Sequence, residues 1–89
     1  MMPKITKIDE NIFDVTVTEA MESTHRVVLT DDYHIELTNG NVTKEKLLEE
    51  AFRFLLNRES NVEIFKEFAL EIIEQYFPAF RTEMRNRFA

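Results

Sequence analysis

The chain has 89 residues, of which 44% are hydrophobic and 31% are charged, a composition that suits one small folded domain. It contains no cysteine, which excludes disulfides and thiolate metal sites, and its single glycine excludes the glycine-rich phosphate loops of common nucleotide-binding enzymes. The net charge of −6 disfavours broad binding to nucleic acid or to anionic membranes. We expect a cytoplasmic protein, because neither a signal peptide nor an apolar run of membrane-spanning length is visible.

The N-terminal part of the chain predicts a β-hairpin. Residues 1–10 alternate only weakly, and we expect an irregular lead-in to a single domain over residues 11–89. Residues 12–18 alternate strictly between apolar and polar side chains, which predicts a strand with one buried face. A second β-rich run follows at 25–30, and the polar residues 19–24 between the two runs predict the loop of an antiparallel hairpin. The side chains expected to face the core of the first strand are Phe13, Val15 and Val17.

The segment Thr30–Leu37 is compatible with two structures. As a strand, its apolar side chains alternate with polar ones. As a helix, Thr30 caps the N-terminus, and Asp31 and Asp32 occupy the first turn, where the helix dipole favours acidic side chains. Gly40 then allows a left-handed turn after the last helical residue. We favour the short helix and keep the strand as the alternative.

Residues 42–59 predict a long helix with Thr43 as a plausible N-cap. Glu49 and Arg53 are four residues apart, a spacing that places opposite charges side by side on a helix. The apolar side chains that recur at helical spacing are Leu47, Leu48, Ala51, Phe52 and Leu55.

Residues 60–77 predict a second long helix. Ser60 and Glu63 have the spacing of a capping box, in which each side chain bonds the other residue's backbone. Only residues 57–59 separate this cap from the preceding helix, so the two helices should form a hairpin of neighbours. The apolar positions with helical spacing are Phe65, Phe68, Ala69, Ile72, Ile73 and Tyr76.

The last residues predict a short C-terminal helix. Pro78 disfavours helical geometry at Phe77 and is itself a good first residue of a new helix. Phe80, Met84 and Phe88 then share one side, which we expect to cover the helical hairpin as a lid. Three arginines near the C-terminus suit the negative end of the helix dipole, and we expect Arg87 to pair with Glu83; the arginines are Arg81, Arg85 and Arg87.

Two sets of residues could in principle bind a metal. Four glutamates would line one face of the second long helix, but di-metal carboxylate bundles also require histidines on their helices, so we expect a solvated face. The histidines His25 and His34 have acidic neighbours in the sequence but no standard ligand spacing, and we expect them at the surface. The glutamates are Glu63, Glu67, Glu71 and Glu74, and the acidic neighbours are Asp31, Asp32 and Glu36.

The sequence offers no catalytic constellation. Neither Ser23 nor Ser60 lies in a Gly-x-Ser-x-Gly motif. The aromatic side chains fall among glutamates on predicted helices, whereas single-strand binders interleave them with basic residues on a sheet. We therefore predict no catalytic, cofactor-binding or metal-binding residue and expect a protein that is not an enzyme.

The chain resembles a family of short, uncharacterised prokaryotic proteins with a β-hairpin followed by helices. The resemblance covers about residues 12–80 and is most specific at "FRFLLNRE" (residues 52–59) and "YFPAF" (residues 76–80). That family has no assigned activity, so the resemblance implies a free-standing domain and transfers no site residue.

A weaker likeness is to ribbon-helix-helix regulators and antitoxins, which dimerise through a strand and read the major groove with its outward side chains. On the first strand those side chains would be Asp14, Thr16 and Thr18, and on the second Arg26, Val28 and Thr30. Only Arg26 carries the charge that DNA binding favours, and a second strand before the helices departs from that fold.

The predicted architecture is an α+β domain in which the β-hairpin packs against the helical hairpin and the short C-terminal helix closes one end. Two strands alone are marginally stable and leave unpaired edges, so a homodimer that extends the sheet is an alternative to a monomer. For function we expect a small interaction or accessory module that binds an unknown protein partner, with the DNA-binding regulator as the alternative.

Overall fold

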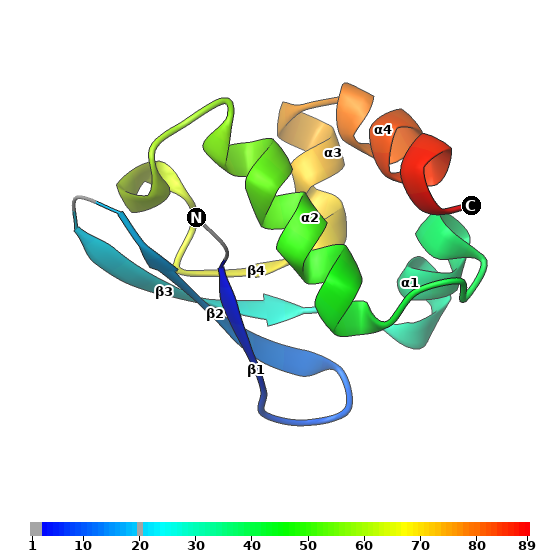
Figure 1. Ribbon diagram of the computed structural model, residues 1–89, viewed down its shortest axis with the longest axis horizontal. Helices are drawn as coiled ribbons and strands as arrows, with labels where there is room; N and C mark the ends of the chain where they lie inside the picture. Colours follow the sequence, from blue (N-terminus) through cyan, green and yellow to red (C-terminus); the bar gives the residue numbers. More distant parts are fainter. Residues whose placement is uncertain (1–2, 20) are drawn as a thin grey trace.

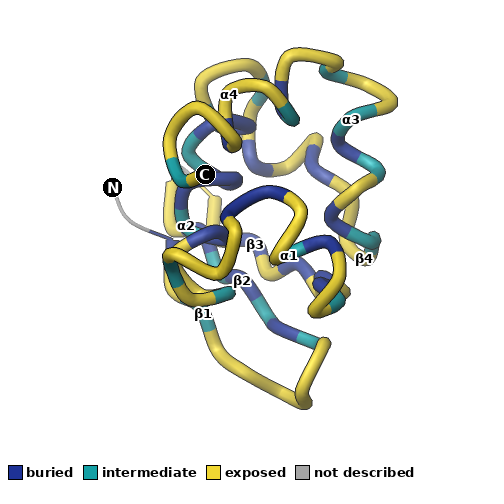
Figure 2. Tube along the Cα trace, turned by 90° about the vertical axis from the view of Figure 1, so that its right-hand side faces the viewer, coloured by how far each residue is buried: buried dark blue, intermediate teal, exposed yellow. Residues whose placement is uncertain are grey.

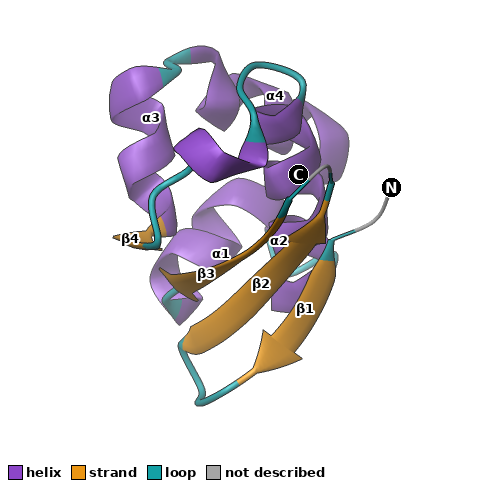
Figure 3. Ribbon diagram, turned by 90° about the vertical axis from the view of Figure 1, so that its left-hand side faces the viewer, coloured by secondary structure: helices purple, strands orange, loops and turns teal. Residues whose placement is uncertain are grey.

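The computed structural model describes residues 3–19 and 21–89 and has an α+β fold, with a four-stranded sheet and helices packed on one of its faces (Figures 1 and 3). The described residues also contain two short 3₁₀ helices, η1 and η2. In chain order the elements are β1 (Lys4–Lys7), β2 (Ile12–Thr18), β3 (Glu22–Val28), α1 (Asp31–Thr38), α2 (Lys44–Leu56), η1 (Asn61–Glu63), β4 (Glu67–Ala69), η2 (Leu70–Ile72), α3 (Ile73–Tyr76) and α4 (Ala79–Phe88).

The predicted hairpin is confirmed as β2 and β3, which pair in antiparallel register with Val15 opposite His25. β2 has the bounds that the alternation predicted, and its three inward side chains are buried. β3 begins at Glu22, so the connecting loop is shorter than expected. On the opposite face Arg26 donates two hydrogen bonds to the Asp14 carboxylate, at 2.9 and 3.1 Å, which gives this solvent-facing surface a neutral pair.

The sheet is wider than the sequence indicated. Residues 4–7, which we expected to belong to an irregular lead-in, form β1 and pair with β2, and Ile5 lies opposite Val15. At the other edge β4 pairs in parallel with β3, so the strand order is β1-β2-β3-β4. A single chain therefore supplies four strands, which removes the reason for expecting a second copy to extend the sheet.

The helices that follow the hairpin are capped as predicted. The Thr30 hydroxyl accepts a hydrogen bond from the Tyr33 amide, and the Thr43 hydroxyl accepts one from the Lys46 amide. The short-helix alternative for Thr30–Leu37 is thus confirmed as α1, and Asn39 and Gly40 both adopt positive φ after it. α2 lies across the sheet and buries the apolar stripe predicted for it.

The predicted second long helix is wrong, and with it the helical hairpin. The capping box of Ser60 and Glu63 forms, but it opens one turn of 3₁₀ helix and the chain then becomes extended up to β4. Helix resumes only in η2 and α3. Residues 62–68 are rich in β-branched and aromatic side chains, which lose rotamer freedom in a helix. The edge of β3 supplies the hydrogen-bonding partners that make the extended form stable.

The C-terminal helix agrees with the prediction. α3 ends at Tyr76, and α4 begins directly after Pro78. Phe80 and Met84 are fully buried and Phe88 is partly buried, so α4 is the lid that we expected. It covers α1 and α2 rather than a pair of long helices (Figure 1).

Candidate functional site

A groove of about 320 Å³ lies where the predicted helix is interrupted. Its walls come from the end of α2, from residues 63–68 and from η2 and α3. The lining is mainly apolar, with Leu55, Ile64 and Ile73 among the buried side chains and Phe65 and Tyr76 among the exposed ones. Figure 2 shows that α3 and β4 lie along the same border of the molecule, where buried and exposed residues meet.

Aromatic rings form the rim of this groove. Phe65 and Tyr76 meet in a T-shaped contact with ring centroids 5.4 Å apart, and Phe65 also contacts Phe68 at 6.3 Å. Tyr76 is 61% exposed and Phe65 is 48% exposed. Val62, which precedes the lining residue Glu63 in the sequence, is also exposed. Large apolar side chains that remain exposed together next to a concave surface are typical of a binding site.

Two carboxylates whose charges act on each other belong to the lining of the groove, those of Glu59 and Glu63. Partial burial raises the pKa of Glu59, and the neighbouring Glu63 charge raises it further. The nearest arginine in the sequence, Arg58, is directed elsewhere, because it stacks on Phe54 at 3.6 Å and pairs with Glu83 at 3.4 Å. Within residues 3–19 and 21–89 neither carboxylate has an ion pair, so this part of the lining is acidic.

A buried polar network lies behind the groove. The two ring nitrogens of His25 contact the Phe65 carbonyl oxygen at 2.7 Å (Nδ1) and the Ser23 hydroxyl at 2.8 Å (Nε2). Asn61 donates its amide hydrogens to Ser23 Oγ at 2.8 Å and to the Met21 carbonyl at 2.7 Å. The network joins β3 to the segment that follows η1, and no buried side-chain nitrogen or oxygen in the described residues lacks a partner.

The prediction that both histidines lie at the surface is wrong for His25, which is completely buried. Burial lowers the pKa of His25, opposed in part by its bond to the Phe65 carbonyl. His34 is partly buried on α1 and contacts the Val42 carbonyl through Nε2 at 2.6 Å. The two histidines thus belong to separate networks. Asp31 pairs with Lys44, and no cluster of metal-ligating side chains occurs among the described residues.

Ser23 and His25 have the spacing of a nucleophile and its base, but the surroundings do not suit catalysis. Both side chains are buried, and neither belongs to the lining of the groove. The Ser23 oxygen already accepts a hydrogen bond from Asn61. The arrangement therefore positions the backbone and leaves no room for a substrate beside the hydroxyl.

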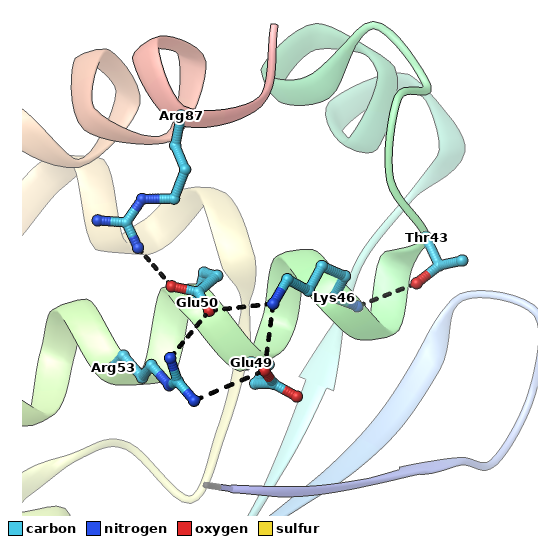
Figure 4. A network of polar contacts seen from close by, with 6 residues as sticks. All are labelled: Thr43, Lys46, Glu49, Glu50, Arg53 and Arg87. Atoms are coloured by element: carbon cyan, nitrogen blue, oxygen red, sulfur yellow. Dashed lines mark hydrogen bonds and ion pairs between the residues drawn. The ribbon is translucent and has the colours of Figure 1, made fainter.

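A second network surrounds Glu50, a carboxylate on α2 that is only 5% exposed (Figure 4). Lys46 and Arg53 reach it from the same helix, at 3.4 and 3.3 Å, and Arg87 reaches it from α4. The predicted pair of Glu49 and Arg53 forms at 3.8 Å. Arg87 was expected to pair with Glu83 and instead ties α4 to α2.

The predicted acidic stripe does not exist as one face, because its helix is interrupted. Glu63 belongs to the capping box, and Glu67 and Glu71 are exposed. Glu74 is partly buried and accepts hydrogen bonds from the Tyr33 hydroxyl and from Arg81. Sequence reasoning missed both the groove and the His25 network, since each depends on the chain leaving the helical path after Glu63.

Searches of family models, curated proteins and solved structures found no match to the chain. The resemblance to short prokaryotic proteins therefore stays a prediction. None of the helices in the described part of the chain has the length and apolar character needed to cross a membrane.

Proposed function

We propose that the protein is a non-enzymatic interaction module that binds a segment of a partner protein in the groove between residues 63–68 and α3. The observation that carries this proposal is the exposure of Phe65 and Tyr76 on the rim of an apolar groove. Aromatic side chains in such positions supply much of the binding energy at protein interfaces. A volume of about 320 Å³ accommodates a few side chains of a partner.

The charges of the groove select the kind of partner. Glu59 and Glu63 place two carboxylates in the lining, and the whole chain carries a net charge of −6. A partner segment that combines apolar anchors with a lysine or arginine would place its cation between these carboxylates and relieve their mutual repulsion. The proposed ligand is therefore an apolar, positively charged peptide segment.

The surface on which the DNA-binding alternative depends is less favourable. Arg26 is the one basic residue in the set of outward side chains that this alternative uses, and its guanidinium is paired with Asp14. Retention of the protein on DNA at low salt, released as salt rises, would revive the alternative.

The experiment that tests the proposal is selection from a library of random peptides displayed on phage, followed by affinity measurements on the enriched peptides. We expect enrichment of peptides with aromatic or aliphatic residues near a lysine or arginine. Tyr76→Ala should weaken their binding by about tenfold or more, as expected for a central aromatic anchor.

The matched control is Ile35→Ala, since Ile35 is also an exposed apolar side chain, at 52%, but lies on α1 outside the groove. It should leave the affinity unchanged. Absence of enriched peptides, or equal effects of the two substitutions, would contradict the proposal.

A further inference from the structure

Segment 61–69 buries Ile64 in the core and packs Phe68 against Phe52, but few hydrogen bonds attach it to the body of the protein. β4 supplies three residues of parallel pairing with β3, and the Arg26 amide donates to the Lys66 carbonyl at 2.7 Å. The remaining hydrogen-bonded attachments to β3 and the residue before it come from the Ser23–His25–Asn61 network. Segments with little regular pairing open more readily than the core to which they are attached.

The hydrogen bonds of the network fix one arrangement of protons. A carbonyl oxygen only accepts, so His25 Nδ1 must carry the proton that reaches the Phe65 carbonyl. In the neutral ring Nε2 is then the acceptor, and the Ser23 hydroxyl donates to it. The Ser23 oxygen is left to accept from Asn61, so the Ser23 hydroxyl, both ring nitrogens of His25 and the Asn61 amide nitrogen all have partners.

A second proton on His25 is incompatible with this arrangement. Nε2 would become a donor, and the Ser23 hydroxyl hydrogen would lose its acceptor in a buried site. The surroundings also disfavour a positive charge: Val15 lies opposite on β2, the Phe52 ring of α2 is 5.6 Å away, and the charge of Lys66 acts from the segment itself. Water can reach the imidazolium only if a segment that packs over the ring moves away from it.

We propose that the Ser23–His25–Asn61 network is a proton-sensitive latch, and that protonation of His25 opens segment 61–69 while the rest of the fold stays intact. The cover that can move is segment 61–69, because Phe52 on the other side belongs to the central helix α2 and is itself fully buried. Of the buried core side chains in the described residues, Ile64 alone comes from segment 61–69, and Phe68 packs against that core. The remaining core side chains, those of β2 and α2 among them, lie outside the segment.

Opening of the latch would also remove the groove, because Ile64, Phe65 and Phe68 are among its walls. This consequence rests on the proposed function, whereas the latch itself does not. Measurements on the protein without any peptide can therefore test the latch separately from binding.

The test is amide hydrogen exchange followed by NMR on the full chain between about pH 7.5 and 5.5, corrected for intrinsic exchange rates. An imidazole that must be exposed before it titrates, with an ordinary pKa near 6.5 in the open state, raises the opening equilibrium about tenfold by pH 5.5. We expect this rise for amides of 61–69 and not for those of β2 and α2. A flat profile, or an equal rise in every element, would overturn the proposal.

Three variants identify the titrating group. His25→Gln should abolish the pH dependence of exchange in the segment. Ser23→Ala retains the imidazole and should keep the dependence, and Glu59→Gln should keep it too, which separates the latch from the carboxylate of Glu59, whose pKa is raised. Persistence of the dependence in His25→Gln would disprove the latch.

A further measurement does not depend on the stability of any variant. ¹⁵N NMR of the wild-type imidazole at about pH 7.5 should show the Nδ1–H tautomer. Because the ring titrates only after opening, its titration midpoint should lie below the ordinary histidine pKa near 6.5 and follow the same opening equilibrium as exchange. An Nε2–H tautomer, or a midpoint that bears no relation to exchange, would also overturn the proposal.

Discussion

Ser23, His25 and Asn61 show how a small core accommodates polar side chains. Each is buried, and the Ser23 hydroxyl, both His25 ring nitrogens and the Asn61 amide nitrogen have hydrogen-bond partners in one another or in the backbone. Such a network stabilises a fold only as a complete set, since a donor or acceptor that loses its partner in a buried site keeps its full desolvation cost.

The substitution Ser23→Ala tests this account. It leaves the Asn61 amide and His25 Nε2 each without one partner, and we expect the free energy of unfolding to fall by about 1–3 kcal/mol. Urea denaturation monitored by circular dichroism measures the change. Thr24→Ala, on the exposed face of the same strand, should cost less than half as much. Equal costs would contradict the role of the network.

Tyr33 gives a prediction for alkaline pH. Burial raises the pKa of its hydroxyl far above the ordinary value of 10.0, and the hydrogen bond to Glu74 raises it further. The folded state thus retains a proton that the unfolded state loses above about pH 10, so this contribution to stability is complete below pH 10 and decreases as the pH rises. The loss should reach roughly 1 kcal/mol near pH 11.

Denaturation of wild type and Tyr33→Phe at pH 9 and pH 11 checks this prediction. The variant lacks the titrating hydroxyl and should lose less stability across the interval. Tyr76→Phe, in which the exposed tyrosine is changed, should behave like wild type. An identical alkaline loss in Tyr33→Phe would exclude Tyr33 as its source.

At the scale of elements, the sequence predicted what local chemistry determines. The strict alternation of residues 12–18 predicted β2, and the hydroxyl caps Thr30 and Thr43 predicted where α1 and α2 begin. Pro78 likewise predicted the boundary between α3 and α4. In each case the signal lies within a few residues of the structure that it specifies.

The prediction failed where partners distant in the chain decide the structure. Residues 60–77 have helical spacing and a capping box. β4 forms instead of a helix because β3, about 40 residues earlier in the chain, offers a free edge for pairing. His25 on β3 likewise supplies a hydrogen-bonding partner for the Phe65 carbonyl. The groove was missed for the same reason, since its walls meet only after the helix is interrupted. Neither β1 nor β4 has enough residues for a strong alternation signal.

The substitution Glu67→Thr separates the two structures for this segment. Threonine suits a strand and costs about 0.5 kcal/mol in a helix relative to glutamate. Because Glu67 is exposed on β4, we expect no loss of stability in urea denaturation. The same change at Glu45, exposed on α2, should destabilise by about that amount or more. Similar losses at both positions would indicate that residues 60–77 are helical.

At the scale of the whole molecule, charge determines how a partner would be held. The net charge of −6 attracts cations over long range, and Glu59 and Glu63 concentrate this attraction at the groove. Because four strands come from one chain, the sheet itself gives no reason for a homodimer, and its polar outer face is occupied by pairs such as Asp14 with Arg26.

Salt dependence of binding tests the electrostatic part of the proposal. The affinity for a selected cationic peptide should fall as sodium chloride rises from about 0.05 to about 0.5 M, because the Debye length shortens. Glu59→Gln should weaken binding at low salt and make it less sensitive to salt. Fluorescence polarisation measures both. An affinity independent of salt and of Glu59 would show that only apolar contacts contribute.

The most direct test of the central claim is to map a selected peptide onto the protein by changes in ¹H–¹⁵N chemical shifts. If the groove is the docking surface, the largest changes will fall on residues 59–77, with Phe65 and Tyr76 among them. The amides of β1 and β2 should hardly change, because they lie away from the groove. Changes centred on the outer face of the sheet, or on the surface of α1 and α4, would contradict the claim.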